Sequence, residues 1–108
     1  MMVGMEPHFP AGIRRLPTYA GRFEAHKLSA EGCEVLFASY PGGSEIEPHS
    51  HGTENHGVVT GGELILEIDG EERGFKPGEW YHISAKASHS ARFEVDTHMI
   101  EFWFQDPG

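Results

Sequence analysis

Two histidines that lie two residues apart are the part of this sequence best suited to chemistry. His49 and His51 fall in residues 43–51, a stretch that reads as a β-strand. Side chains at positions i and i+2 leave a strand on the same face, so both imidazoles can point into one cavity. A third histidine, His89, begins a later strand-like run. We expect His49, His51 and His89 to bind one divalent transition-metal ion through imidazole nitrogens.

The residues around these histidines predict a small all-β domain. The chain has 108 residues, which suits one domain with one core. Strands are predicted at residues 22–28, 33–40, 55–60, 63–68, 71–75, 79–83, 89–95 and 98–104, and Asp69-Gly70 is a favoured two-residue hairpin turn. No segment keeps helical periodicity for long enough to compete. Many short strands with tight turns predict a double-sheet jelly-roll barrel, which encloses a cavity at this size.

The N-terminal residues differ in composition from the rest. Residues 1–20 contain three prolines and two glycines and are predicted to form an arm with a helical turn at residues 11–16, ahead of a barrel domain at residues 21–108. The arm is too apolar, at Phe9, Ile13 and Leu16, to stay free in water. We expect it to cover a sheet edge in its own or a neighbouring subunit. Closed two-fold pairs are the commonest oligomers, so a homodimer is predicted.

Charge and cysteine content narrow the partners and the compartment. The formal net charge is −9, which argues against nucleic acid as a partner. No apolar run approaches membrane-spanning length, and the N-terminus lacks the layout of a signal peptide. The single cysteine, Cys33, cannot form an internal disulfide. We therefore expect a cytoplasmic protein whose partner is a small molecule.

The histidines and turns together resemble the cupin family over roughly residues 35–105. That family's first motif fits Gly43, then His49 and His51, and ends at a glycine at position 61 or 62. Its second motif runs from Gly78 to His89 without a gap. The resemblance implies a double-stranded β-helix, with the three histidines as metal ligands.

The second motif departs from the family pattern at three positions. The sequence has Ser84, Lys86 and Phe93 where the family carries proline, glycine and asparagine. These are turn and packing positions, so the predicted fold stands and only the shape of the loop is affected.

The family's first motif also implies an acidic fourth ligand. Counting back from Gly62 places Asn55 in that position, and counting back from Gly61 places Glu54 there. We favour Asn55, with Glu54 as a supporting group, a rival ligand or an acid/base. Three imidazoles and an amide leave the ion both positive charges, which attracts anionic substrates. Such a site suits Zn, Fe, Mn, Ni, Co or Cu, whereas calcium requires an oxygen shell.

One further carboxylate is a candidate for catalysis. Glu101 lies between Met99 and Trp103 on one face of the last predicted strand, and the other face is entirely apolar. If the face with Glu101 lines the cavity, burial raises the pKa of that carboxyl and makes it a candidate general acid/base. The competing interpretation is simple alternation, with Glu101 in water. His56, His82 and His98 are interpreted as surface or hydrogen-bonded histidines.

Cupins carry many unrelated activities, so fold does not select a function. One interpretation is a metal-dependent enzyme that moves a proton on a small anionic metabolite. In this respect the sequence resembles uronate-linearising cupins, with three histidines, an amide ligand and an acid on the last strand. The alternatives are an iron-dependent dioxygenase and a non-catalytic module that binds a metal or a small ligand.

Overall fold

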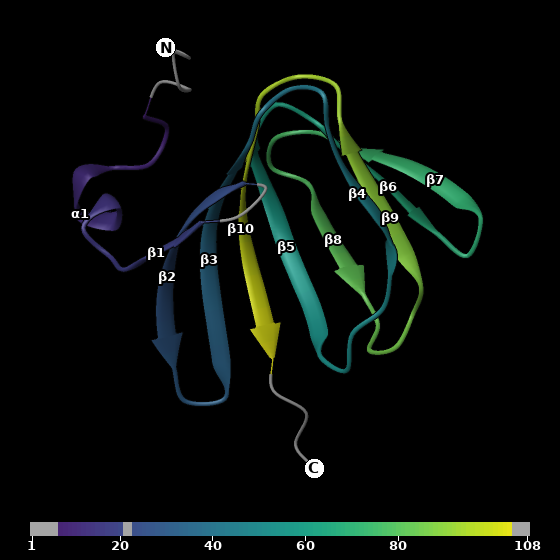
Figure 1. Cartoon of the computed structure of the whole chain (residues 1–108), viewed down its shortest axis with the longest axis horizontal. Coiled ribbons are helices and arrows are strands. Elements are labelled where there is room, and N and C mark those ends of the chain that lie inside the picture. Colours follow the sequence, from purple (N-terminus) through teal and green to yellow (C-terminus); the bar gives the residue numbers. More distant parts are fainter. Residues whose placement is uncertain (1–6, 21–22, 105–108) are drawn as a thin grey trace.

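Two antiparallel β-sheets make up the molecule, a computed structural model that describes residues 7–20 and 23–104. Figure 1 shows the six-stranded sheet on the left and the four-stranded sheet on the right, with loops joining them at the top. This architecture confirms the predicted all-β jelly roll. Among the described residues, no helix has the length and apolar character needed to span a bilayer.

The six-stranded sheet has the order β1-β2-β3-β10-β5-β8. Its strands are β1 (Thr18–Ala20), β2 (Glu24–Ala30), β3 (Cys33–Tyr40), β10 (Thr97–Phe104), β5 (Glu54–Gly61) and β8 (Trp80–Ile83). The four-stranded sheet has the order β4-β9-β6-β7. Its strands are β4 (Ser44–His49), β9 (His89–Phe93), β6 (Leu64–Ile68) and β7 (Glu71–Phe75). The predicted start of the first strand at Arg22 lies outside the described residues.

Side chains alternate between a buried and a more open face along the central strand β10. Met99 and Glu101 are buried, whereas Ile100 and Phe102 are only partly buried. The buried face of β10 joins a core made by both sheets, whose members are Ala25, Ala38, Tyr40, Val59, Leu64, Leu66, Phe75, Tyr81, Ile83, Phe93 and Met99. The apolar periodicity of the strands thus places one mixed row, including a carboxylate, inside the barrel.

One hairpin turn and one contact between strands depend on particular residues. Asp69 and Gly70 have φ values of 51° and 81°, the left-handed conformations that a type I′ hairpin needs, so the predicted turn is present. Gly57 on β5 lies opposite Tyr81 on β8. A Cβ atom at Gly57 would come within 2.3 Å of the Tyr81 ring. The absence of a side chain at Gly57 therefore lets Tyr81 pack across the strand.

The N-terminal arm covers the outer side of the six-stranded sheet in its own subunit. A short helix, α1 (Ala11–Arg14), lies within the stretch predicted to form a helical turn. Before it, Phe9 is buried and meets the ring of Phe37 edge-on, with centroids 5.6 Å apart. His8 stacks on His98 with centroids 4.1 Å apart. After it, β1 pairs with β2 and forms one edge of the sheet.

Candidate metal centre

His49, His51 and His89 converge although they come from three separate segments. His49 ends β4 and lies opposite His89, the first residue of β9. His51 lies in the loop before β5, not in the continuous strand that its spacing predicts, because β4 ends at His49. One ring nitrogen from each of the three histidines lies within 4.8 Å of the others. This spacing allows the three imidazoles to share one ion.

A backbone carbonyl fixes the orientation of each imidazole. The Nδ1 atoms of His49, His51 and His89 donate to the carbonyl oxygens of Glu47, Thr53 and Ala87 at 2.9, 3.0 and 3.0 Å. A ring that donates through Nδ1 keeps the lone pair of Nε2 free, which is the usual state of a metal-bound histidine. Burial lowers the pKa of His89, and His49 and His51 lower it further. The ring of His89 is thereby favoured in its neutral, ligating form.

The Nε2 atom of His51 is buried and lacks a hydrogen-bond partner among the described residues. Within the described residues it is the one buried side-chain nitrogen or oxygen without a hydrogen bond. An unsatisfied buried polar atom costs about 1–3 kcal/mol, so such atoms are rare without a reason. The Trp103 ring lies edge-on to His51, with centroids 4.7 Å apart, and shields it. The three histidines fit a metal ion, which would satisfy this nitrogen.

A loop at residues 84–88 connects this cluster to the neighbouring strands. The Lys86 amide donates to the His51 carbonyl at 2.6 Å, and Ala87 accepts the bond from His89. Lys86 has a φ of 69°, a left-handed conformation that favours glycine. Lysine here is one of the departures from the family motif noted above. At Lys86 the loop therefore adopts the left-handed backbone conformation that the glycine of the family motif would favour.

Asn55 lies on the inner face of β5 and is 2% exposed. Its amide nitrogen donates to the carbonyls of Phe102 at 3.2 Å and His56 at 3.4 Å. Within the described residues, no hydrogen bond is made to its side-chain oxygen. The two donated bonds therefore orient the amide and leave that oxygen available as a ligand.

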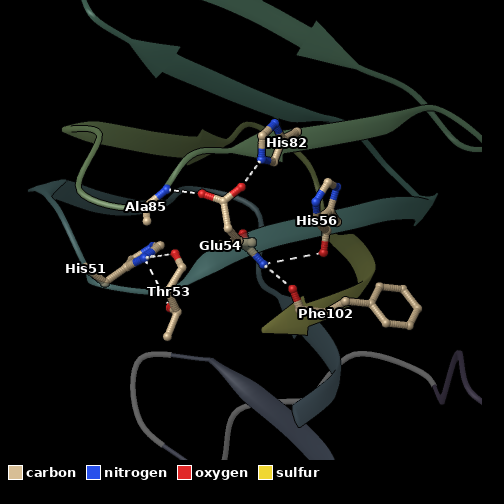
Figure 2. A network of polar contacts seen from close by, with 8 residues as sticks. His51, Thr53, Glu54, His56, His82, Ala85 and Phe102 are labelled. Atoms are coloured by element: carbon tan, nitrogen blue, oxygen red, sulfur yellow. Dashed lines mark hydrogen bonds and ion pairs between the residues drawn. The ribbon is translucent and has the colours of Figure 1, made fainter. Parts of the chain in front are cut away.

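Glu54 lies on the opposite face of the same strand. Figure 2 shows its carboxylate between His82, whose Nε2 donates at 2.7 Å, and the backbone amide of Ala85. The Ala85 bond, followed by the His82 bond, lowers the pKa of the Glu54 carboxyl. Both oxygens are thus engaged away from the three histidines.

A cavity of about 460 Å³ lies beside the histidines, and residues of both sheets line it. His49, His89, Asn55 and Glu101 all contribute to its wall. A larger hollow of about 680 Å³, lined by residues of β5, β6, β7 and β8, contains none of the three histidines. We take the smaller cavity as the candidate site, because it brings the possible ligands and a carboxylate together.

Glu101 is 3% exposed and has two donors in the cavity wall. Tyr40 donates its hydroxyl to Oε2, and the indole Nε1 of Trp103 donates to Oε1 at 3.1 Å. Burial raises the pKa of Glu101, while the Tyr40 and Trp103 bonds act in the opposite direction. Burial also raises the pKa of Tyr40, and the charge of Glu101 adds to that effect. This carboxylate is positioned and partly desolvated, as a proton-transfer group requires.

Tyr40 is a site residue that was not predicted. Its ring is stacked between Phe93 and Phe23, with centroids 4.2 and 4.5 Å away. Alternation along β3 places Tyr40 on the same face as Leu36 and Ala38, so the sequence could have indicated that its side chain points inward. Its bond to Glu101 depends on the pairing of β3 with β10 and leaves no local trace in the sequence.

Comparison with known proteins agrees with this geometry. The Cupin_2 family model, described as a cupin domain, matches residues 35–104. The chain therefore belongs to the cupin family. Among curated proteins, none matches the sequence.

Several solved structures share the fold. An RmlC-like cupin from Shewanella frigidimarina is 17% identical, with a TM-score of 0.78, and the alignment covers 94% of each chain. KdgF from Halomonas sp. is 18% identical, with a TM-score of 0.74 and coverage of 86% of this chain and 91% of that one. The DMSP lyase DddQ from Ruegeria pomeroyi is 19% identical, with a TM-score of 0.71 and coverage of 80% and 48%. At these identities the similarity shows a shared fold.

Proposed function

We propose that this cupin is a metal-dependent enzyme that transfers a proton on a small anionic metabolite, in an isomerase- or lyase-type reaction. The observation that carries the proposal is the buried carboxylate of Glu101 in the same cavity as His49 and His89. A divalent ion held there would polarise a carbonyl or hydroxyl oxygen of the substrate. Zn, Fe, Mn, Ni, Co and Cu all suit a site rich in imidazole.

The ligands are His49, His51 and His89 through Nε2, with the side-chain oxygen of Asn55 as the fourth. The bonds at the three Nδ1 atoms and at the Asn55 amide leave these atoms free. A set of neutral ligands does not reduce the charge of the ion, so a substrate carboxylate is attracted. Lys27, which also lines the cavity, adds a positive group, although Glu34 pairs with it at 3.2 Å.

Glu101 is the group that accepts and returns the proton. Its raised pKa makes the carboxylate a stronger base than one in water, which suits a group that accepts a proton and later returns it. Tyr40 and Trp103 hold its two oxygens in place. Glu54, first considered for this role, is not retained, because its oxygens bind His82 and Ala85 on the other face.

The substrate class rests on resemblance as well as on charge. Uronate-linearising cupins resemble this chain in the proposed ligand set and acid position, and a structural neighbour is named as a DMSP lyase. In the proposed reaction, a C–H bond next to an oxygen function activated by the metal loses its proton. Small carboxylates that carry an acidic C–H are therefore the compounds to test.

Deuterium exchange gives a direct test of this proposal. The metal-loaded protein is incubated in D2O with unsaturated uronates and other small keto or hydroxy carboxylates, and NMR follows carbon-bound deuterium. Exchange or turnover is expected, and Glu101→Gln should slow it by about 10²–10⁴-fold while metal content stays the same. Oxygen consumption by the iron-loaded protein would support a dioxygenase instead. Metal binding without exchange or turnover would support a binding module.

We further propose a homodimer that forms through the open edge of the six-stranded sheet. Strand β1 has β2 on one side only, and Tyr19 on it is 50% exposed. Open edges invite pairing, and a two-fold axis would pair β1 with its own copy. Light scattering should give twice the chain mass at micromolar concentrations, and monomer mass would contradict the proposal.

A cytoplasmic location, proposed from the free thiol of Cys33, can be checked by cell fractionation.

A further inference from the structure

We propose that Glu54, His56 and His82 form a second transition-metal site, on the outer face of the six-stranded sheet, and that zinc(II) is the ion it suits best. One ligand-capable atom from each of the three side chains lies within 4.8 Å of the others. Two imidazole nitrogens and one carboxylate oxygen form a donor set that binds zinc and leaves a coordination position open. This inference does not depend on the proposed function of the cavity.

The pairing of two strands brings the three side chains together. Glu54 and His56 are two residues apart on β5, so they leave the strand on the same face. His82 on β8 lies directly opposite His56 in the register. The two imidazole rings stack with centroids 4.3 Å apart and an angle of 12°. Figure 2 shows His56 and the Glu54 carboxylate on the same side of the sheet as His82.

The carboxylate is already oriented for this role. The Ala85 amide holds Oε2 of Glu54, which leaves Oε1 facing His82 Nε2 at 2.7 Å. Two ligands on one zinc ion at bond lengths near 2.0 Å lie about 3.3 Å apart, so loading requires an opening of about 0.6 Å. The side chains of His82 and Glu54 are 45% and 44% exposed and can make this small movement.

An ordinary ion pair does not account for the whole cluster. It explains the bond between Glu54 and His82 but gives no role to His56. Within residues 7–20 and 23–104 the ring of His56 makes no hydrogen bond, although it lies over His82. An ion between the rings would use the free nitrogen of His56 together with the Glu54–His82 pair.

The site is independent of the cavity and open to water. Alternation along β5 turns Asn55 toward the cavity, while Glu54 and His56 point to the other side. His56 and His82 also line the hollow of about 680 Å³, where water or an exchangeable anion can complete the coordination shell. The two sites therefore share no ligand.

A calorimetric zinc(II) titration tests the proposal. The wild-type protein should bind one equivalent more than either His56→Ala or His82→Ala. Glu54→Gln keeps an acceptor for the Ala85 amide but loses the charge, and should weaken the additional site by at least about tenfold, the scale on which even supporting groups act. His26→Ala, which removes a histidine outside the cluster, is the matched control and should keep both equivalents.

A second measurement does not rely on variants that must fold. In wild-type protein that already holds one equivalent of zinc, cobalt(II) should shift the ring NMR signals of His56 and His82 together, before those of His26. Unchanged stoichiometry in both histidine variants would overturn the proposal. Equal cobalt shifts at His26 and His82 would do the same, because they would indicate only non-specific binding.

Discussion

The hydroxyl of Tyr40 donates a hydrogen bond to the buried carboxylate of Glu101 across the paired strands β3 and β10. The aromatic rings stacked on both sides of Tyr40 restrict its movement. Trp103 donates to the other carboxylate oxygen at 3.1 Å. An acid in this position has a fixed orientation, and burial penalises its charged form.

The first prediction concerns stability and pH. Because burial raises the pKa of Glu101 in the folded state above its ordinary value of 4.5, the folded protein holds this proton more tightly than the unfolded chain. The associated stability is present below pH 4.5 and is lost as the pH rises toward the folded pKa. Metal-free Glu101→Gln does not titrate there, so the stability of this variant relative to wild type should grow as the pH rises above 4.5, by about 1.4 kcal/mol for each unit by which the pKa is raised.

Urea unfolding of the two metal-free proteins at a series of pH values above 4.5 measures this effect. A difference in free energy of unfolding between the two proteins that stays constant with pH would show that Glu101 ionises in the folded protein as it does in water.

The second prediction concerns Tyr40. Tyr40→Phe removes a donor that lowers the pKa of Glu101, so that pKa should rise. In the proposed reaction, the acidic limb of the pH–rate profile should move to higher pH while metal content stays unchanged. The rate profile of the variant, compared with its metal analysis, checks this. A uniform loss of rate with no shift of the limb would mean that Tyr40 serves only packing.

The third prediction concerns the ligands. In a His56→Ala background, which removes the outer site, His51→Ala should lose the remaining tight metal equivalent. Its Nε2 is the buried nitrogen that lacks a partner. Elemental analysis after desalting gives the stoichiometry, and His26→Ala in the same background serves as the control. Retention of one tight equivalent by the His51 variant would remove this residue from the ligand set.

The fourth prediction separates an amide ligand from a carboxylate. Asn55→Asp places a negative charge where we propose the fourth ligand and should tighten divalent-ion binding by on the order of tenfold. It should also weaken the binding of anions, because the site loses positive charge. Asn55→Ala should loosen the ion. If metal affinity is the same in all three proteins, Asn55 lies outside the coordination shell.

The fifth prediction concerns Gly57. Gly57→Ala forces a methyl group against the Tyr81 ring, which a Cβ atom would approach to 2.3 Å. Overpacking of this kind costs about 1–3 kcal/mol. Chemical denaturation should show the loss, and Gly12→Ala, where a Cβ atom meets nothing within 4 Å, is the control.

The features that sequence could predict depend on local spacing. Strand alternation and the Asp69-Gly70 turn predicted the sheets and one hairpin, and both are present. The histidines were found by spacing and by family resemblance, yet the strand that was expected to carry both His49 and His51 ends at the first. The local pattern does not reveal the register shift near the end of β4.

The remaining features depend on contacts between distant residues. Tyr40 meets Glu101, 61 positions later, only because β3 pairs with β10. His56 and His82 were interpreted as surface or hydrogen-bonded histidines, and they are exposed. Their stacking follows from the pairing of β5 with β8, and no residue near either position indicates it. Counting back from the last glycine of the first motif could not decide between Asn55 and Glu54. Gly61 and Gly62 are adjacent, and either could be that glycine.

The place of β10 has a consequence for how the protein is made. It is the last described strand in the chain, yet it lies between β3 and β5. During synthesis, the six-stranded sheet cannot form completely until residues 97–104 are available, because β10 joins β3 to β5. Until then, the facing edges of β3 and β5 are unpaired. The pairing of β4 with β9, which brings His49 to His89, needs no part of β10. His49 and His89 belong to the four-stranded sheet and Glu101 and Trp103 to the six-stranded sheet, so the proposed ligands and the carboxylate meet only where the two sheets pack together.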